Sequence, residues 1–349
     1  MPNRVYIFHK NGANSHYVAL EKLLNKHKIE IKFYEFSVIG KILKSITKFQ
    51  PSLFVRQIQN IKFILFLLFT KNQKVLLGIA PYDKKIKSLS WLLKNHQVYY
   101  HTSWCCWDKS FQPKKIKSKK VLEDWRCFLE EQVKHIFCVT SVAQNQILEN
   151  YNIDKTITSV VLHSLKPDFS VDLTSKTEKT KNSFICIGRL IPAKGIEEIL
   201  EYFKNNPSLS LTLVGDGSLK IMAESYSEDY NNINFLGKIS NTKTLKKLLA
   251  QHQYLLLNSI KTSKWEELFG IVIIEAMSQG TIPISSNHPG PKDIINQSIG
   301  ILFEEGKLTE TLDKIDLENY PNLISDNGRQ EAEKYTSENI SQLWKVILD

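Results

Sequence analysis

The sequence lacks the features that mark membrane-spanning, secreted and zinc-binding proteins. Its longest apolar run, residues 63–69, has seven residues, well short of the roughly 20 that a spanning helix needs. The start of the chain lacks the basic segment, long apolar stretch and cleavage site of a secretory signal, so we expect a cytoplasmic protein. The five cysteines include no CxxC pair, which argues against a disulfide framework or structural zinc and predicts free thiols.

Glycine and proline are not in excess, and acidic residues are scarce in only one half of the chain. Hydrophobic residues make up 42% of the sequence, which excludes collagen-like and disordered chains. Residues 1–175 hold 27 Lys and Arg against 13 Asp and Glu, whereas residues 176–349 hold 19 against 23. The basic half is therefore expected to meet an acidic partner: nucleic acid, an anionic membrane surface or a phosphorylated substrate.

The length of 349 residues predicts two domains of ordinary size. Short apolar runs alternate with helical patterns in both halves, which predicts two α/β domains with parallel sheets. The strands predicted in the first half are residues 5–8, 29–34, 74–77, 96–100, 136–139 and 159–162, and the helices are 17–25, 41–49, 123–134 and 143–150. The strands predicted in the second half are residues 183–187, 209–214, 232–236, 254–257 and 282–285, and the helices are 195–203, 242–250 and 270–278.

Residues 172–182 are mostly polar and predict a linker. We place the first domain at residues 1–170 and the second at residues 171–334. The tail is helical in pattern from residue 326 to 348, and we expect residues 335–349 to pack back on the first domain. One apolar face of this tail consists of Ile340, Leu343, Trp344 and Ile347.

Two motifs of the second domain are suited to phosphate. Arg189 follows a predicted strand, and Lys194 precedes a predicted helix. The planar guanidinium of Arg189, the ammonium of Lys194 and the backbone N–H groups of the helix N-terminus together suit a diphosphate. A solvated basic loop is the alternative. Gly215 and Gly217 follow the next strand and could let backbone approach a nucleotide, but the third glycine of a dinucleotide fingerprint is replaced by Lys220. The alternative interpretation of this second motif is an ordinary strand-to-helix turn that binds no ligand.

A third motif places two glutamates eight positions apart, Glu267 before a predicted helix and Glu275 within its apolar body. A lone carboxylate on so apolar a helix costs several kcal/mol unless a donor hydrogen-bonds it. Sugar hydroxyls would serve as donors. The alternative is a capping Glu267 and a Glu275 that a protein donor satisfies.

In this order the three motifs resemble those of the retaining glycosyltransferases of family 4, also described as glycosyl transferases group 1. The resemblance covers about residues 183–303. It implies an α/β fold of the GT-B type, with two Rossmann-like domains whose parallel sheets face each other across a cleft, and a nucleotide-sugar donor held mainly by the second domain. By position, Arg189 and Lys194 match the family's diphosphate-binding residues, Glu267 the residue at the donor sugar, and Glu275 the residue at the ribose hydroxyls. The rest of the implied donor set is Gly215, Phe269, Gly270 and Ile271.

The first domain matches the family at fewer positions. Gly12 falls in the first strand-to-helix loop, where the family places a glycine near the donor phosphate. His101 matches the histidine that the family sets beside the reacting sugar, and a satisfied core histidine is its alternative. His163 and Ser164 stand where the hinge between the domains usually has Asn-Gly, and residues 287–293 depart from the family's glycine pair.

No metal site is expected, because the sequence has no Asp-x-Asp, no paired histidines and no cysteine cluster. Charge on a leaving diphosphate would be stabilised by Arg189, Lys194 and a helix dipole, in line with the metal-independent chemistry that the resemblance implies. No carboxylate of the first domain stands out as a nucleophile, so we favour front-face attack over a covalent intermediate. The expected catalytic residues are His101, Glu267, Arg189 and Lys194, and no cofactor is expected.

Residues 41–74 mix lysines with apolar side chains, and together with the basic residues 114–120 they predict an interfacial membrane surface in which Phe63, Phe66 and Phe69 insert. A core helix with a solvated basic face is the alternative. The expected function is transfer of a hexosyl unit from a nucleotide sugar, UDP-linked, to a glycan or lipid-linked acceptor of bacterial lipopolysaccharide, O-antigen or capsule. Expected partners are this donor, this acceptor and an anionic membrane, without nucleic acid. The rival function is a polyanion- or nucleic-acid-binding protein that uses the basic half.

Overall fold

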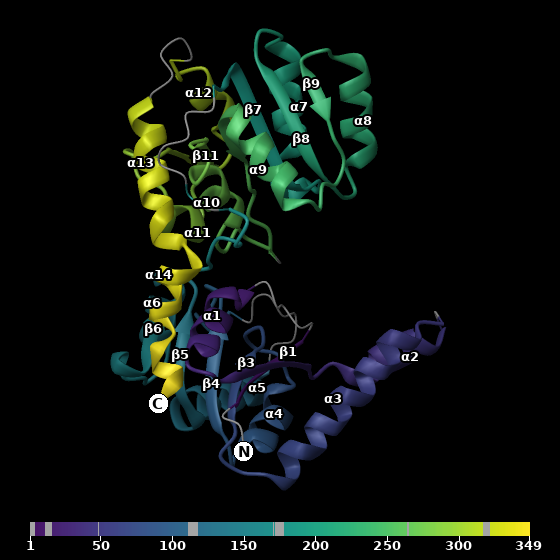
Figure 1. Ribbon diagram of the computed structural model, residues 1–349, viewed down its shortest axis with the longest axis vertical. Coiled ribbons are helices and arrows are strands. Elements are labelled where there is room, and N and C mark those ends of the chain that lie inside the picture. Colours follow the sequence, from purple (N-terminus) through teal and green to yellow (C-terminus); the bar gives the residue numbers. More distant parts are fainter. Residues whose placement is uncertain are drawn as a thin grey trace. The chain divides into compact units, whose positions relative to one another are not determined.

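The computed structural model describes residues 4–10, 16–47, 49–110, 118–169, 171, 178–263, 265–316 and 322–349. The chain divides into two compact units. The first consists of Met1–His163 together with Ile340–Asp349, and the second of Ser164–Asn339. Each unit is built on a sheet of six parallel strands (Figure 1). The fold class predicted from the sequence, α/β with two parallel sheets, is confirmed.

In the first unit the strand order is β2-β1-β3-β4-β5-β6. Apolar runs form these strands because both faces of a parallel sheet are covered by helices. The chain runs outward in one direction from β1 to β2 and in the other from β3 onward, so the order reverses between β1 and β3. The strands are β1 (Arg4–His9), β2 (Glu30–Glu35), β3 (Lys74–Gly78), β4 (Gln97–Thr102), β5 (Val133–Cys138) and β6 (Thr158–Val160).

The helices of the first unit bury one apolar face each. In α1, for example, Leu20, Leu23 and Leu24 recur at helical spacing and are buried. The helices are α1 (Val18–Lys26), α2 (Val38–Thr47), α3 (Pro51–Phe69), α4 (Ile86–Leu93), α5 (Lys119–Cys127) and α6 (Ser141–Asn150). A π-helical turn, Phe128–Gln132, leads from α5 into β5.

The last ten residues of the chain pack on the first unit. Trp344 is 2% exposed, and its ring centroid lies 4.6 Å from that of Phe137 on β5. Lys74 Nζ donates hydrogen bonds to the carbonyl oxygens of Ile347 and Leu348 at 3.1 and 2.6 Å. Leu343, predicted to share this apolar face, is 41% exposed, so its inclusion was wrong: the helix α14 (Ser337–Leu343) ends there and the chain changes to a tighter turn.

In the second unit the strand order is β12-β11-β10-β7-β8-β9. Its strands are β7 (Thr180–Arg189), β8 (Ser210–Asp216), β9 (Ile233–Phe235), β10 (His252–Leu257), β11 (Ile282–Ser286) and β12 (Ile301–Phe303). Its helices are α7 (Ile196–Asn205), α8 (Lys220–Asp229), α9 (Thr242–Gln251), α10 (Ile271–Met277), α11 (Pro289–Ile294), α12 (Leu308–Leu312) and α13 (Asn322–Ala332). The order reverses between β7 and β10, the kind of position where open α/β sheets bind ligands.

Several element boundaries were predicted wrongly. The predicted helix 123–134 ends earlier, because Val133 already begins the buried strand β5. The predicted linker 172–182 overlaps β7, which starts at Thr180. Helices α4 and α8 were not predicted, and neither was α3, whose apolar residues occur on nearly every side and blur the helical period.

Helix α3 is also long and apolar enough to cross a membrane by length and composition, with a mean hydropathy of 1.4 over 18 residues, of which 22% are buried. Its Phe63 is 4% exposed and stacks on Tyr34 with ring centroids 3.9 Å apart. The prediction that Phe63 inserts into a membrane was therefore wrong, because this ring belongs to the core of the first unit. Residues 114–117, part of the basic segment 114–120 assigned to the same surface, lie outside the described residues.

Candidate functional site

The donor-binding residues predicted in the second domain lie at or near the carboxyl edge of the second sheet. Arg189 ends β7, and its side chain is exposed. Gly215 lies near the end of β8 and pairs with Gly188 of β7. A Cβ atom on Gly215 would lie 1.8 Å from the carbonyl oxygen of Gly188, so no larger residue fits. The absence of a side chain at Gly215 thus lets β8 lie close to the carbonyl of Gly188 at this edge of the sheet.

Lys194 and Glu267 form an ion pair at this edge, although 73 positions separate them. Both side chains are only 13% exposed. Ser259, which follows β10, donates a hydrogen bond from Oγ to Glu267 Oε2 at 3.2 Å. The ammonium of Lys194 also lies 4.9 Å from the ring centroid of Trp265. Because a carboxylate and an aromatic face hold this cation, Lys194 is positioned before any anion binds.

Glu275 lies inside α10, which begins directly after Gly270. Gly270 has φ +82°, a left-handed conformation that residues with a side chain adopt at a cost, and it lets the chain turn from the Glu267 segment into the helix. The neighbours of Glu275 on this helix, Ile273 and Ile274, are buried. Glu275 itself is 6% exposed, as the apolar sequence around it predicts.

The partner of Glu275 is Lys166, whose Nζ lies 2.9 Å from Oε1. Lys166 is 44% exposed and its ammonium lies 5.9 Å from the ring centroid of Phe169. Burial raises the pKa of Glu275, and the charge and hydrogen bond of Lys166 oppose that rise without cancelling it. A buried carboxylate with one protein donor still has acceptor capacity for hydroxyl groups.

A second charged group, Glu266 with His288, shares Ser259 as a neighbour with the Lys194–Glu267 ion pair. His288 follows β11, and its Nε2 lies 2.7 Å from the carbonyl oxygen of Ser259. Its Nδ1 lies 3.7 Å from Glu266 Oε1, and Lys261 Nζ lies 3.1 Å from the same oxygen. Burial lowers the pKa of His288, but its bonds to Glu266 and Ser259 outweigh that effect and leave the pKa above its ordinary value.

In the first unit, His101 lies at the carboxyl end of β4 and is 6% exposed. Its Nδ1 lies 3.1 Å from the hydroxyl of Tyr17, and its ring centroid lies 5.3 Å from that of Trp344. Burial, with a contribution from His163, holds the pKa of His101 well below its ordinary value, so the imidazole is neutral at pH 7. Its Nε2 is buried without a hydrogen-bond partner in the described part of the chain.

Three further histidines, His9, His16 and His163, lie near His101 at this edge of the first sheet. The rings of His16 and His163 lie 4.6 Å apart, and those of His101 and His163 lie 6.3 Å apart. Burial lowers the pKa of His163 to about 3 and that of His9 to about 4. The group is therefore uncharged at neutral pH and places no cation at this edge of the sheet.

The structure brings some of the predicted residues together and leaves others apart. Lys194 contacts Glu267 directly. Phe269 is buried and Ile271 half-buried at the start of α10, whereas Gly12 lies outside the described residues. His101 belongs to the other unit. Sequence reasoning missed Ser259, Trp265, Lys166 and His288, although Ser259 and His288 each follow a buried strand, a signal that could have identified them.

Comparison with known proteins identifies proteins that are similar to this chain in sequence and in fold. Residues 172–335 match the family described as Glycosyl transferases group 1. The chain is 25% identical over 256 residues to the O-antigen biosynthesis glycosyltransferase WbnH of Escherichia coli. This alignment covers 72% of this chain and 69% of WbnH.

Solved structures share the fold at lower identity. HepE of Anabaena, determined in complex with UDP, matches with a TM-score of 0.67 and 16% identity over 99% of both chains. A variant of S. aureus TarM, determined with fondaparinux, α-GlcNAc-glycerol and UDP, matches with a TM-score of 0.60 and 19% identity over 83% of this chain, which spans 59% of the TarM chain. Residues 172–335, most of the second unit, thus match the glycosyl transferases group 1 family, and the chain as a whole shares the GT-B fold of these solved structures.

Proposed function

We propose that this protein is a retaining, metal-independent glycosyltransferase that moves a hexosyl unit from a UDP-sugar to a glycan or lipid-linked acceptor of bacterial lipopolysaccharide, O-antigen or capsule. The relative WbnH acts in O-antigen biosynthesis by its name. HepE and TarM were both determined in complex with UDP. These similarities support the donor and acceptor classes, while the residues of this chain support the roles given below.

The observation that carries the proposal is the largely buried ion pair of Lys194 and Glu267, five positions after the exposed Arg189 at the end of β7. We assign Arg189 and Lys194 to the donor diphosphate, since a planar fork and a fixed ammonium together match two phosphate groups. Glu267 then accepts hydrogen bonds from hydroxyls of the donor sugar. Glu275 accepts them from the ribose, because its buried carboxylate has a single protein donor in the described part of the chain.

The proposed reaction proceeds by front-face attack. The bond between the anomeric carbon and the β-phosphate oxygen breaks, and the acceptor hydroxyl oxygen bonds to the same carbon on the same face. Its proton passes to the departing phosphate oxygen. Arg189 and Lys194 stabilise the negative charge that develops on the diphosphate, an effect that fixed cations supply without reorganisation. No covalent enzyme intermediate is needed.

The second unit, residues 164–339, is assigned to the donor and the first unit to the acceptor. His101 is neutral and buried, with Nδ1 near the hydroxyl of Tyr17 and Nε2 unpartnered within the described residues. We assign it a hydrogen bond to the reacting sugar rather than a charge. This role adds no positive charge next to the oxocarbenium-like centre that develops at the anomeric carbon.

Nucleotide-dependent thermal stability tests the donor assignment. A ligand that binds only the folded state stabilises it by about 2.7 kcal/mol at 100 times its Kd, so UDP or the correct UDP-sugar should raise the Tm by several degrees. Arg189→Ala should lose most of this shift, whereas Lys220→Ala, at an exposed ion pair on α8, should keep it. A Tm that responds equally to heparin, DNA and UDP would favour the polyanion-binding alternative and contradict the proposal.

Metal removal provides a second test. Transfer activity should survive EDTA, because the diphosphate charge is assigned to Arg189 and Lys194. The measurement is product formation from a UDP-sugar before and after dialysis against EDTA. A full loss of activity that Mg²⁺ or Mn²⁺ restores would contradict the metal-independent chemistry while leaving the donor class intact.

A further inference from the structure

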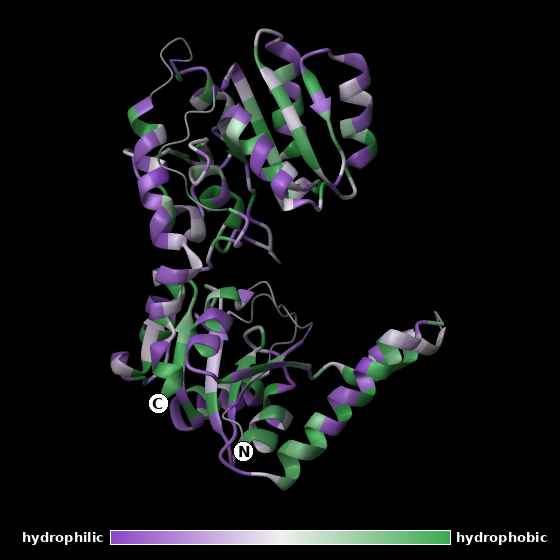
Figure 2. Ribbon diagram, in the orientation of Figure 1, coloured by the Kyte–Doolittle hydropathy of each residue, from purple (hydrophilic) through white to green (hydrophobic). Residues whose placement is uncertain are grey.

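Exposed apolar side chains concentrate on one part of the first unit. Of the fourteen large hydrophobic residues that are exposed in the described chain, nine lie between residues 38 and 94. We call the exposed side chains of this segment the α2–α4 surface; α2 and α3 extend together from the sheet, and Figure 2 shows apolar and polar residues mixed along them. The nine are Ile39, Leu43, Phe49, Phe54, Val55, Leu65, Leu68, Phe69 and Trp91.

Helix α3 is partly inverted relative to an ordinary amphipathic helix. Its inward positions include Gln57 and Asn60, which are 0% and 2% exposed and hydrogen-bonded to each other at 3.1 Å. Both also bind Glu35, Gln57 at its carboxylate and Asn60 at its backbone N–H. Val55, Leu65 and Phe69 are 56%, 47% and 86% exposed. A helix that buries amides and exposes Leu and Phe has an outward face suited to an apolar partner.

The charged residues of the same segment are almost all basic. From residue 36 to 94 the sequence has eleven basic residues and one acidic residue, Asp83. Asp83 is 8% exposed, and the preceding acid, Glu35, is 4% exposed and pairs with Lys41 and Arg56. The outward charge of the α2–α4 surface is therefore positive. The basic residues of this stretch that are exposed in the described part of the chain are Arg56, Lys62, Lys71, Lys84, Lys85, Lys87 and Lys94.

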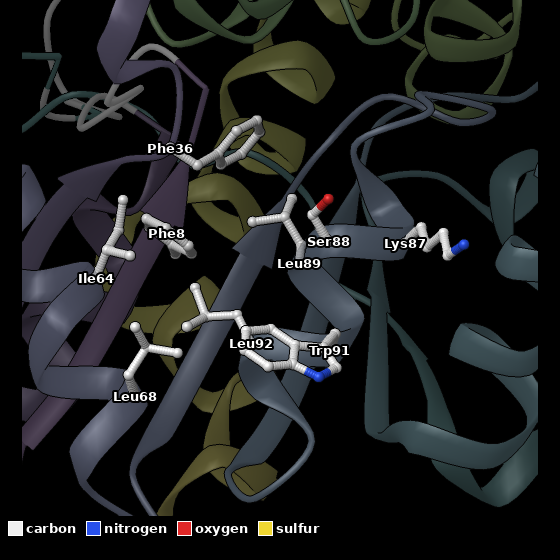
Figure 3. A pocket seen from close by; sticks show the side chains of 9 residues that line it. All are labelled: Phe8, Phe36, Ile64, Leu68, Lys87, Ser88, Leu89, Trp91 and Leu92. Carbon is white, nitrogen blue, oxygen red and sulfur yellow. The ribbon is translucent and has the colours of Figure 1, made fainter.

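A groove opens on this surface between α3 and α4. Its volume is about 700 Å³, and it lies against β1 at its base. Figure 3 shows Ile64 and Leu68 of α3 facing Leu89 and Leu92 of α4, with Trp91 beside them. A second cavity of about 610 Å³ shares Ile64 and Leu89 with the groove and adds lysines at its rim. These lysines are Lys10, Lys41 and Lys85.

The geometry points to the α2–α4 surface as a docking site for an anionic lipid bilayer. Its apolar side chains enter the acyl boundary, its lysines meet lipid phosphates, and the groove between α3 and α4 faces the hydrocarbon. Two copies of one cationic face would repel each other, which disfavours a dimer. Nucleic acid would leave nine exposed apolar groups without a partner. The inference concerns the first unit and does not depend on the identity of the sugar donor.

Helix α3 docks parallel to the membrane rather than crossing it. Arg56 and Lys62 lie within the helix, and charged side chains at the centre of a bilayer are costly. Its Phe63 is held by the sheet through Tyr6 and Tyr34, with ring centroids 5.0 and 3.9 Å away. An interfacial position keeps both the charges hydrated and this contact intact.

Flotation of the full chain with vesicles tests whether the lysines of the α2–α4 surface contribute to membrane binding. Binding to phosphatidylcholine vesicles that contain phosphatidylglycerol should exceed binding to phosphatidylcholine alone, and it should weaken as the Debye length falls from about 10 Å at 0.1 M salt to about 3 Å at 1 M. The triple variant Lys62→Glu, Lys84→Glu, Lys87→Glu should lower partitioning at least about tenfold. The matched control reverses three exposed lysines of the second unit: Lys238→Glu, Lys243→Glu, Lys247→Glu.

Apolar insertion is tested separately. Leu65→Gln with Phe69→Gln should lower the salt-resistant fraction of binding, whereas Ile221→Gln with Leu323→Gln, which are 80% and 74% exposed in the second unit, should not. Brominated acyl chains should quench Trp91 fluorescence, read as the difference between the protein and its Trp91→Phe variant. Unchanged far-UV circular dichroism and Tm would show that the variants remain folded.

The inference would be overturned by equal binding to both lipid mixtures, by no binding to either, by an equal loss in the matched control variants, or by resistance of bound protein to carbonate extraction. The last would indicate a spanning helix. A concentration-dependent dimer that the Leu65→Gln, Phe69→Gln pair abolishes would also overturn it, because the face would then serve a second copy. Donor-dependent Tm shifts are expected to be unchanged in every α2–α4 variant, so failure here is distinguishable from failure of the proposed function.

Discussion

Replacing Lys194 with alanine is expected to lower kcat for sugar transfer about 100- to 1,000-fold, the usual loss when one fixed group that stabilises transition-state charge is removed. The large effect follows from position: the ammonium is only 13% exposed and is held by Glu267 and the ring of Trp265. A cation held in this way needs no rearrangement as charge develops on the diphosphate. Steady-state kinetics with a UDP-sugar and acceptor measure the loss.

The control is Lys220→Ala, which removes an ammonium from an exposed pair with Glu224 on α8 and should leave kcat within about twofold, since exposed ion pairs contribute little. A double-mutant cycle adds a second readout. Because Lys194 and Glu267 contact each other, the effects of Lys194→Ala and Glu267→Gln should be strongly non-additive. A wild-type rate in the variant Arg189→Ala, Lys194→Ala would remove both residues from the diphosphate site.

The sequence predicts the strands of the two sheets better than the helices that cover them. Strands such as β4 and β10 are short buried runs flanked by polar residues, so composition alone locates them within two or three residues. The π-helical turn before β5 breaks the simple period, and the prediction there extended a helix into a strand. Helix α3 was missed because tertiary contacts, not a clean apolar stripe, decide which of its residues are buried.

In the candidate site, too, the sequence predicts some features and not others. Arg189, Lys194, Glu267 and Glu275 are identifiable by type and by their place after strands or at helix starts. Their partners are not, because Lys166 reaches Glu275 across 109 positions and no local pattern encodes that contact. Trp265 lies two positions before Glu267, but the sequence does not show that its ring contacts the ammonium of Lys194. Pairings of this kind require three-dimensional structure.

Replacing Glu275 with glutamine is expected to weaken donor binding about 10- to 150-fold, equivalent to roughly 1.5 to 3 kcal/mol for a hydrogen bond to a charged group. Glutamine keeps the size of the side chain, so the helix α10 and its buried neighbours should be preserved. Isothermal titration with UDP, which carries the ribose but not the sugar, isolates this contact from those of Glu267. Wild-type affinity for UDP would show that the ribose lies elsewhere.

The dependence of donor affinity on pH separates the roles of Glu275 and Lys166. Burial raises the pKa of Glu275, and Lys166 is the group that counteracts this rise. As the pH falls through that pKa, the carboxylate gains a proton and loses acceptor capacity, so the Kd for UDP should increase. In Lys166→Gln the pKa rises further, and the increase in Kd should occur at a higher pH than in the wild type. In Glu275→Gln this component should vanish. Identical pH profiles in wild type and Lys166→Gln would show that the ammonium does not govern the charge of Glu275, and the ion pair would then have no part in donor binding.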